Sequence, residues 1–319
     1  MPELAPQRLP DSRSTDFQFA PRMMLFVTDF SRACQNAWPY ALAIAHEYHS
    51  KLLLVHVIDP VIFANVPSKL ASAARELVRH EKEDQLKFLQ RSEGTPELDF
   101  ELLLREGEIA EILLRIVQER GVNLLVAGTR GRTRTERLLL GSVAEKLFRQ
   151  AGCPSLVVPE RANFDEKFVI RRILCPIDFS PDSHNALALA TSIARRHGAQ
   201  LILMHVLRDD LTTRESEKEW VVHNARHQLR KLLDQHNNLP FETLFEITAG
   251  VVPEQISRTA TEYHADVVII SVHPGAGTVA HERERNAYKT IRWSRCAILT
   301  VPRSRHSIVG SNSSTLAEH

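Results

Sequence analysis

The chain repeats itself, and this internal repeat limits its fold more than any other feature of the sequence. The segment Val27-Thr28-Asp29-Phe30-Ser31 matches Pro176-Ile177-Asp178-Phe179-Ser180, so that position 29 corresponds to position 178, an offset of 149 residues. Further along, Gly107 corresponds to Gly250, an offset of 143 residues. Two constant offsets predict two copies of one domain, the second copy being shorter in the region that corresponds to 59–107.

The repeat also sets the domain boundaries. A chain of 319 residues is long enough for two domains of ordinary size. We expect residues 21–160 to form the first domain and residues 168–303 the second, with a short polar linker at 161–167. Residues 1–20 and 304–319 are polar, and we expect them to be disordered tails.

Each copy alternates apolar runs with amphipathic segments. In the first copy Met23–Thr28 is a largely apolar run of the kind found in buried parallel strands. Further strands are predicted at Leu52–Ile58, Leu98–Leu104, Leu124–Ala127 and Leu156–Val158. Helical spacing is shown by three groups of apolar residues: Ala37, Ala41, Ile44 and Ala45; Leu77, Val78, Leu86 and Leu89; Ile109, Ile112, Leu113, Ile116 and Val117. The alternation predicts an α/β fold in which each copy is a doubly wound parallel sheet covered on both faces.

A glycine-rich segment follows the fourth expected strand. Gly128, Gly131, Gly141 and Ser142 form the pattern Gly-x2-Gly-x9-Gly-Ser directly after Ala127. Glycine lets backbone N–H groups approach an anion, and a helix beginning near Ser142 would add unpaired N–H groups and the positive end of its dipole. Ser142 can cap that helix or donate its hydroxyl to the anion. The spacing therefore predicts a nucleotide site beyond the carboxyl ends of the strands.

Three features together resemble the universal stress proteins. They are Thr-Asp-Phe-Ser at 28–31, His-Val at 56–57, and the glycine pattern. The resemblance covers nearly the whole chain as a tandem pair. It implies two five-stranded parallel sheets of strand order 3-2-1-4-5, the adenine-nucleotide alpha-hydrolase-like fold, which often dimerises through its last strand. It also implies adenine-nucleotide binding and a role in the stress response or signalling.

The resemblance assigns nucleotide contacts to residues of the first copy. Asp29 would contact the adenosine, and the backbone of Val57 would meet the adenine. Ribose and phosphates would be held by Gly128, Gly131, Gly141 and Ser142, with Thr28 and Val143 as neighbours. The glycine loop also carries Arg130 and Arg132, either of which could reach the γ-phosphate or simply be solvated. We expect ATP to be the ligand and Mg²⁺ to accompany it.

The second copy departs from the glycine pattern. The positions that correspond to Gly128, Gly141 and Ser142 are Ser271, Glu284 and Arg285. Glu284 would place a negative charge where phosphate should lie. We therefore expect the first copy alone to bind ATP, and the second copy to provide a pseudo-symmetric partner surface within the chain. Pairing of two chains as a homodimer is the alternative use of that surface.

The type of activity stays open among three alternatives. Asp29 could act as a general base, but no His, Ser or Cys stands at a known catalytic spacing, which favours a fixed acceptor. The chain has no Gly-x4-Gly-Lys-Ser/Thr loop, so any ATP hydrolysis should be weak. The sequence favours a nucleotide-dependent signalling module over a slow ATPase or nucleotidyl-transferring enzyme, or a nucleotide-independent scaffold or chaperone-like protein. Residues 275–280 fit Gly-x-Gly-x-x-Ala, but they do not follow the first strand of a copy, which argues against a dinucleotide site.

Charge and cysteine content bear on partners and location. The net charge of +1 gives no reason to expect nucleic acid or an acidic membrane as a partner. We see no apolar run long enough to span a bilayer and no apolar core of a secretory signal near the N-terminus. The four cysteines are far apart in the sequence, which is typical of proteins in a reducing compartment. A cytoplasmic location is the resulting expectation.

Overall fold

A single sheet of ten strands runs through both copies. The computed structural model describes residues 19–91, 97–129, 142–162, 169–207, 215–235, 242–272 and 278–302, with the backbone alone described at 142, 215–216 and 278–281. The strands of the first half are β1 (Met23–Val27), β2 (Lys51–Ile58), β3 (Phe100–Glu106), β4 (Leu124–Gly128) and β5 (Ser155–Val158). Those of the second half are β6 (Arg172–Pro176), β7 (Gln200–Leu207), β8 (Thr243–Ala249), β9 (Val267–Val272) and β10 (Ala297–Pro302).

The strand order confirms the doubly wound topology predicted for each copy. The sheet reads β3-β2-β1-β4-β5-β10-β9-β6-β7-β8, which is the order 3-2-1-4-5 twice, joined at the last strands. Within each half the neighbouring strands are parallel, whereas β5 and β10 are antiparallel. Leu156 of β5 pairs with its equivalent, Leu299 of β10. A pseudo-two-fold axis between the two halves therefore passes through this pair, and the two expected sheets become one.

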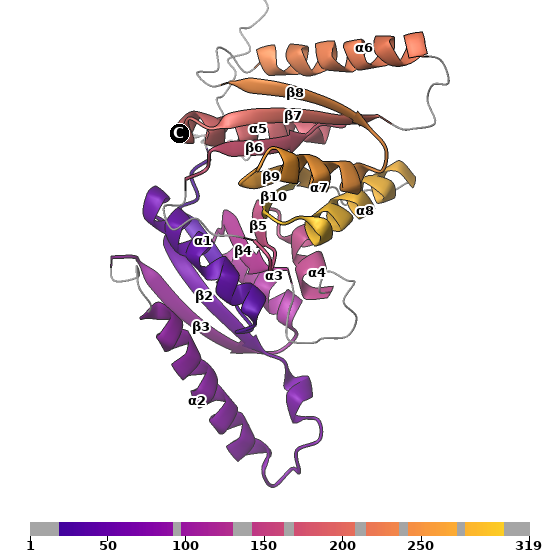
Figure 1. The fold of residues 1–319 in the computed structure, drawn as a ribbon. Helices are drawn as coiled ribbons and strands as arrows, with labels where there is room; N and C mark the ends of the chain where they lie inside the picture. Colours follow the sequence, from indigo (N-terminus) through magenta and orange to yellow (C-terminus); the bar gives the residue numbers. More distant parts are fainter. Residues whose placement is uncertain are drawn as a thin grey trace, which may run out of the picture.

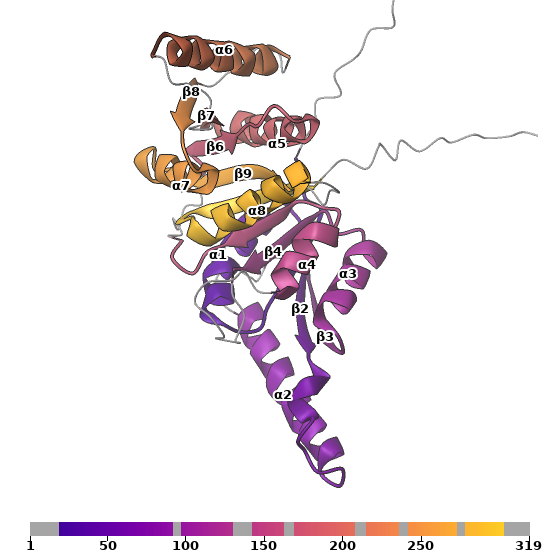
Figure 2. The same cartoon turned by 90° about the vertical axis from the view of Figure 1, so that its right-hand side faces the viewer.

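Helices cover both faces of the sheet (Figures 1 and 2). Those of the first half are α1 (Arg32–Tyr48), η1 (Pro60–Phe63, a 3-10 helix), α2 (Ala71–Gln90), α3 (Ile109–Glu119) and α4 (Ser142–Gln150). Those of the second half are α5 (Pro181–His197), α6 (Glu215–Asp234), α7 (Val252–Glu262) and α8 (Thr278–Trp293). Helices α1, α2, α5 and α6 share one core with the sheet, and α3, α4, α7 and α8 share the other. The first pair of each half thus lies on one face and the second pair on the opposite face, as right-handed crossovers require.

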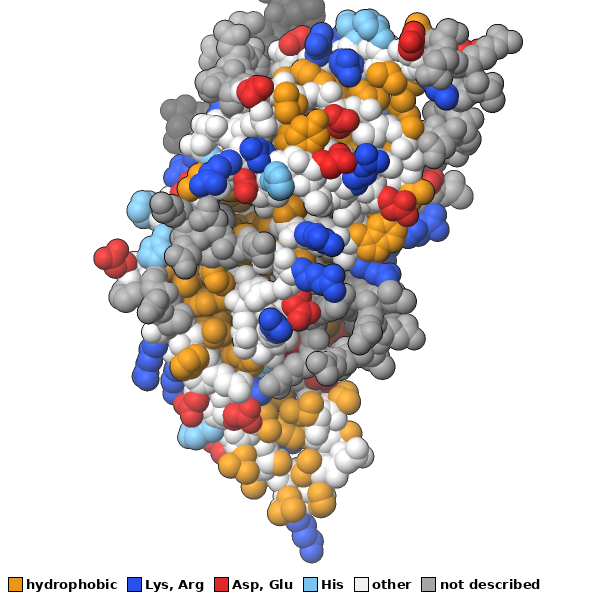
Figure 3. Space-filling view, in the orientation of Figure 1, with side chains coloured by type: hydrophobic (Ala, Val, Ile, Leu, Met, Phe, Trp, Pro, Cys, Tyr) orange, Lys and Arg blue, Asp and Glu red, His pale blue; other side chains and the backbone are white. Residues whose placement is uncertain are grey.

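The helical stripes predicted from the sequence pack against the cores in α1 and α3, but only in part in α2. The predicted positions of α1 and α3 pack into the two cores. In α2, Leu86 is buried, but Leu77 is 73% exposed, so its assignment to the buried stripe is wrong. The first turns of α2 and the preceding η1 project beyond the sheet, and apolar side chains gather over this end of the molecule (Figures 1 and 3). The helical spacing predicted the helix correctly, but it could not show that the sheet ends before the first turns of α2.

Interactions across the pseudo-two-fold axis join the halves on the face covered by α1 and α5. Glu47 in α1 and Arg196 in α5 occupy equivalent positions, 149 residues apart. Their side chains meet, with Arg196 Nε donating to Glu47 Oε1 at 2.7 Å. Ahead of β1, the N–H of Phe19 donates to Ser192 Oγ of the second half at 2.8 Å. The chain thus contains its own domain interface. None of the described helices is both long and apolar enough to cross a membrane.

Candidate functional site

The ends of three strands converge at the centre of the first half. Strand β1 pairs with β2 on one side and with β4 on the other, so the strand order reverses at β1. This neighbour relation brings Thr28, Asp29, Val57 and Gly128 to the same edge of the sheet. Ligands of open α/β sheets bind at such a switch point. The structure therefore places the described part of the predicted site at the position where this topology binds ligands.

The turn after β1 is held by its own side chains. The N–H of Thr28 still donates to Val55 O at 3.0 Å, and Thr28 Oγ1 accepts from the N–H of Phe30 at 2.9 Å. Asp29 Oδ1 accepts from the N–H of Ser31 at 2.9 Å and from the Cys34 thiol at 3.1 Å. Burial, with the nearby Asp29 charge as a smaller cause, raises the pKa of Cys34 to about 11. The thiol is therefore a protonated donor that helps to fix Asp29, and it is not a nucleophile.

Phe30 is in a left-handed conformation, which is unusual for a residue with a side chain. Its φ is 61°, and its ring lies 4.8 Å from the ring of His56. His56 Nδ1 is 2.7 Å from the carbonyl oxygen of Thr28, so that this nitrogen must carry the proton and donate. The second half repeats the arrangement, with Phe179 at φ 58° and His205 Nδ1 2.7 Å from Ile177 O. The histidine therefore braces the turn in both halves, including the half that lacks the glycine pattern.

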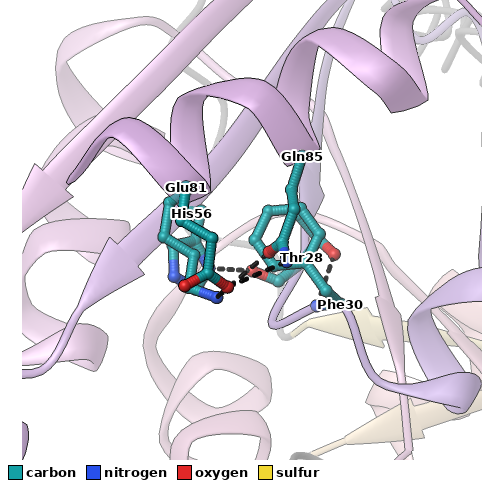
Figure 4. A network of polar contacts seen from close by, with 6 residues as sticks. Thr28, Phe30, His56, Glu81 and Gln85 are labelled. Carbon is teal, nitrogen blue, oxygen red and sulfur yellow. Dashed lines mark hydrogen bonds and ion pairs between the residues drawn. The ribbon is translucent and has the colours of Figure 1, made fainter. Parts of the chain in front are cut away.

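Figure 4 shows Glu81 and Gln85 of α2 near the turn that carries Thr28 and Phe30. A buried cation of the same helix distinguishes the first half. Lys82 of α2 is 6% exposed, and its Nζ lies 5.4 Å from the centre of the Phe30 ring. It donates to Glu81 Oε1 at 2.9 Å and to Gln85 Oε1 at 3.0 Å. If the buried Leu86 and Leu229 are taken as equivalent, Ala225 stands where the first half has Lys82. Lys82 was missed from the sequence, although it lies four residues before Leu86 and interrupts an otherwise apolar stripe.

A cleft of about 560 Å³ opens beside this cluster. Thr28, Phe30 and Cys34 line it from the β1–α1 side, and Gln85 and Phe88 line it from α2. Pockets for small molecules typically have volumes of about 300–1,000 Å³, with aromatic walls and a few polar groups. The cleft adjoins the switch point through Thr28.

Gly128 has a packing role that the sequence did not indicate. A Cβ built at this position would lie 2.6 Å from the carbonyl carbon and 2.8 Å from the Cβ of Ala33, in the first turn of α1. The expected reason for this glycine was access of backbone N–H groups to an anion. The structure shows that Gly128 is required by the close approach of α1 to the end of β4.

The rest of the glycine pattern is only partly described. Arg130, Gly131, Arg132 and Gly141 lie outside the residues that the structure describes. Helix α4 begins at Ser142, as predicted, and Val143 in its first turn packs against the core of that face.

The corresponding region of the second half is built differently. Helix α8 begins at Thr278, seven residues before Arg285, the position that corresponds to Ser142. Arg283 of this stretch pairs with Asp178, its Nε lying 2.8 Å from Asp178 Oδ2. The equivalent of Asp29 is thus bonded to a cation of the protein itself.

Glu284 was expected to repel phosphate, but in the structure its carboxylate forms an ion pair with the other half. The side chain is 4% exposed and pairs with Arg149 of α4 in the first half, Arg149 Nη2 donating to Glu284 Oε2 at 2.8 Å. The hydroxyl of Tyr288 donates to Oε1 at 3.0 Å. Glu284 is therefore a contact between the halves, made by two residues 135 positions apart that no short-range pattern could connect.

Comparisons with known proteins agree with the fold and the repeat. A sequence model described as the universal stress protein family matches residues 22–159 and again 170–301. A universal stress protein of Methanocaldococcus jannaschii is 30% identical over 138 residues, which cover 43% of this chain and 81% of that protein. One from Thermus aquaticus is 32% identical over 143 residues, covering 43% of this chain and 98% of that protein. The crystal structure of a universal stress protein from Archaeoglobus fulgidus, 18% identical, covers 90% of this chain and 100% of its own with a TM-score of 0.62.

Proposed function

Because the chain belongs to the universal stress protein family, we propose that its first half binds one molecule of ATP with Mg²⁺ and that the chain acts as a nucleotide-dependent signalling module. The observation that carries this proposal is the convergence of Thr28, Asp29, Val57 and Gly128 at the switch point beside β1. The turn that presents Asp29 is fixed by hydrogen bonds before any ligand arrives, which lowers the ordering cost of binding.

In this proposal, different residues of the crevice hold the adenosine and the phosphates. Asp29 accepts from a hydroxyl or amine of the adenosine, and the backbone of Val57 meets the adenine. The first turn of α4, at Ser142 and Val143, has N–H groups without partners inside the helix, and it offers them and the positive end of the helix dipole to the phosphates. Gly128, Gly131 and Gly141, with Arg130 and Arg132, complete the phosphate side.

The second half is proposed to bind no ATP by this route. Its acid, Asp178, is bonded to Arg283, and its last helix begins two turns earlier than α4 does relative to the repeat. A nucleotide there would have to displace an ion pair and compete with a formed helix. One nucleotide per chain is the expected stoichiometry.

Signalling requires the bound nucleotide to influence a second surface, and α4 offers a route. This helix begins at the proposed phosphate site and carries Arg149, which bonds Glu284 of the second half. A nucleotide that binds one position of α4 more tightly than another would bias how the halves pack.

The test is calorimetric titration of the full chain with Mg-ATP. We expect one site, and a dissociation constant raised at least about tenfold in Asp29→Asn, because a hydrogen bond to a charged group contributes about 1.5–3 kcal/mol. The asparagine keeps Oδ1 for the N–H of Ser31, so that the turn survives. Its thermal unfolding should match that of the unmodified chain.

The repeat supplies a matched control at the equivalent position of the second half. Asp178→Asn should leave the affinity and the stoichiometry unchanged. Two equivalents of ATP per chain, or equal losses from Asp29→Asn and Asp178→Asn, would refute the assignment to the first half. Absence of any heat or thermal stabilisation with Mg-ATP would refute nucleotide binding itself.

A further inference from the structure

The turn that carries Asp29 has an unfavourable backbone conformation. Phe30 in this turn has φ 61°, in the left-handed region that residues with a side chain rarely adopt. Phe179, its equivalent in the second half, has φ 58°. Such conformations persist only where the surrounding contacts hold them. Each half must therefore brace its own turn, and His56 and His205 contribute to this brace in the same way.

The second half adds a cation that bonds the acid of its turn. Arg283 Nε lies 2.8 Å from Asp178 Oδ2, and the N–H of Ser180 donates to Asp178 Oδ1 at 3.0 Å. The ion pair ties the turn to α8, but it uses the carboxylate that corresponds to Asp29. A turn braced in this way has its acid bonded to a cation of the protein, which makes it a poor acceptor for a ligand.

The first half has a cation on a different helix. Lys82 of α2 is 6% exposed, and its Nζ lies over the Phe30 ring, 5.4 Å from the ring centre. Contact between an ammonium group and an aromatic face is favourable, and more so where water is excluded. Ala225, which stands 143 residues after Lys82, cannot make this contact. The cation of the first half thus contacts the turn through the ring of Phe30.

Neighbours on the same helix hold the ammonium group of Lys82 in place. Nζ donates to Glu81 Oε1 at 2.9 Å and to Gln85 Oε1 at 3.0 Å. Gln85 Nε2 in turn donates to Glu81 Oε1 at 3.1 Å. A buried charge needs such partners. Because they all come from α2, they fix the position of the charge relative to that helix, and the Phe30 ring joins α2 to the turn.

We propose that Lys82 is a positioning residue, which holds the β1–α1 turn in the conformation that receives a ligand at Asp29. It acts through the neighbouring Phe30 ring, whereas Arg283 of the second half acts on the acid itself. This difference explains why two turns of the same shape suit different uses. The identity of the ligand rests on the proposed function, but the brace is a property of the free chain and can be measured without nucleotide.

Cys34 reports the opening of this turn. Its thiol donates to Asp29 Oδ1 at 3.1 Å, and burial raises its pKa to about 11, so that alkylation requires the turn to open. Cys175 in β6 is fully buried and reports unfolding of the sheet. The test measures the alkylation rates of both cysteines by iodoacetamide at pH 8 in the full chain, with peptide mass spectrometry to assign the sites.

Lys82→Met keeps a long unbranched side chain but removes the charge. The Cys34 rate should rise about fivefold or more, the effect of losing a desolvated contact between a cation and a ring, and the Cys175 rate should change less than about twofold. A residue needed only for overall stability would raise both rates together. The carboxylate of Glu81 is 59% exposed and stays solvated in this variant. Lys82→Arg keeps a cation and should leave the Cys34 rate within about twofold of that of the unmodified chain.

Phe30→Leu supplies the matched background, since leucine meets the same left-handed strain without a ring. Lys82→Met should have no further effect on the Cys34 rate in that background. The proposal is overturned if Lys82→Met leaves the Cys34 rate unchanged or raises the Cys34 and Cys175 rates by the same factor. It is also overturned if the effect persists in full in Phe30→Leu, or if Lys82→Arg speeds Cys34 alone as much as Lys82→Met does.

The same assay separates the brace from the proposed function. Mg-ATP at about ten times its dissociation constant should slow Cys34 alkylation about tenfold, both in the unmodified chain and in Lys82→Met. No slowing in either chain with millimolar Mg-ATP would count against the nucleotide site. The rates without nucleotide would still decide whether Lys82 braces the turn.

Discussion

Replacement of Gly128 by alanine tests how closely α1 packs against the end of β4 at the candidate site. The added methyl group would lie 2.6 Å from the carbonyl carbon of Ala33, whereas ordinary contact begins near 3.4 Å. Relief therefore requires β4 and the first turn of α1 to separate by about 0.8 Å. The obstacle is backbone and Cβ, which cannot rotate away as the end of a long side chain can.

The expected loss in the free energy of unfolding is about 3 kcal/mol. Overpacking in well-packed interiors costs about 1–3 kcal/mol, and a collision with backbone belongs at the upper end. The same movement shifts the turn that carries Asp29, since this turn leads directly into α1. Nucleotide affinity should therefore fall together with stability.

Urea unfolding followed by circular dichroism measures the change, and Gly152 supplies the matched control in the same half. Gly152 has φ +69° and no atom within 4 Å of a built Cβ, so that alanine there meets conformational strain without a collision. Strain of this kind costs about 1–2 kcal/mol. If Gly128→Ala is no more destabilising than Gly152→Ala, the close approach of β4 and α1 does not exist and the reasoning fails.

Three further results are expected. Arg149→Met should lower the free energy of unfolding by about 2 kcal/mol, because Glu284 would keep a buried charge while Arg149 itself is 39% exposed; a double-mutant cycle with Glu284→Gln that gives no coupling would contradict the pair. Burial lowers the pKa of His197 and of His205 below 6.5, so the unfolded chain binds more protons. The free energy of unfolding should therefore decrease as the pH is lowered below about 6.5, and urea midpoints that stay constant from pH 7.5 to 5.5 would oppose this. Cys34, buried and with a pKa of about 11, should resist iodoacetamide in the native protein at pH 8, and rapid modification seen by mass spectrometry would show that the turn opens.

The sequence predicted the sheet well, because its signals are local. Buried parallel strands are continuous apolar runs, and the strands β1, β2 and β4 fall within a residue of the predicted ranges. The repeat then allowed the second half to be inferred from the first. Asp29, Val57 and Gly128 were placed near one another because the carboxyl ends of parallel strands share an edge.

The remaining features depend on contacts between distant segments. Glu284 was interpreted from its position in the glycine pattern, but its partner is Arg149 in the other half. Lys82 occupies a core-facing position that helical spacing would assign to an apolar residue, and its charge is met there by the Phe30 ring and by the side-chain oxygen atoms of Glu81 and Gln85. Leu77 has helical spacing but lies beyond the sheet that would have covered it.

The contact between Glu47 and Arg196 influences whether a half pairs with the other half of its own chain or with the same half of a second chain. On a two-fold axis each position faces its own equivalent, so two first halves from separate chains would oppose glutamate to glutamate, and two second halves arginine to arginine. Because the two halves of one chain differ in sequence, the equivalent positions carry opposite signs, which disfavours both of these pairings and favours the covalently linked half. Since that neighbour is tethered, its local concentration stays in the millimolar range however few molecules the cell contains. The pairing of the two halves therefore does not depend on how much of the protein the cell makes.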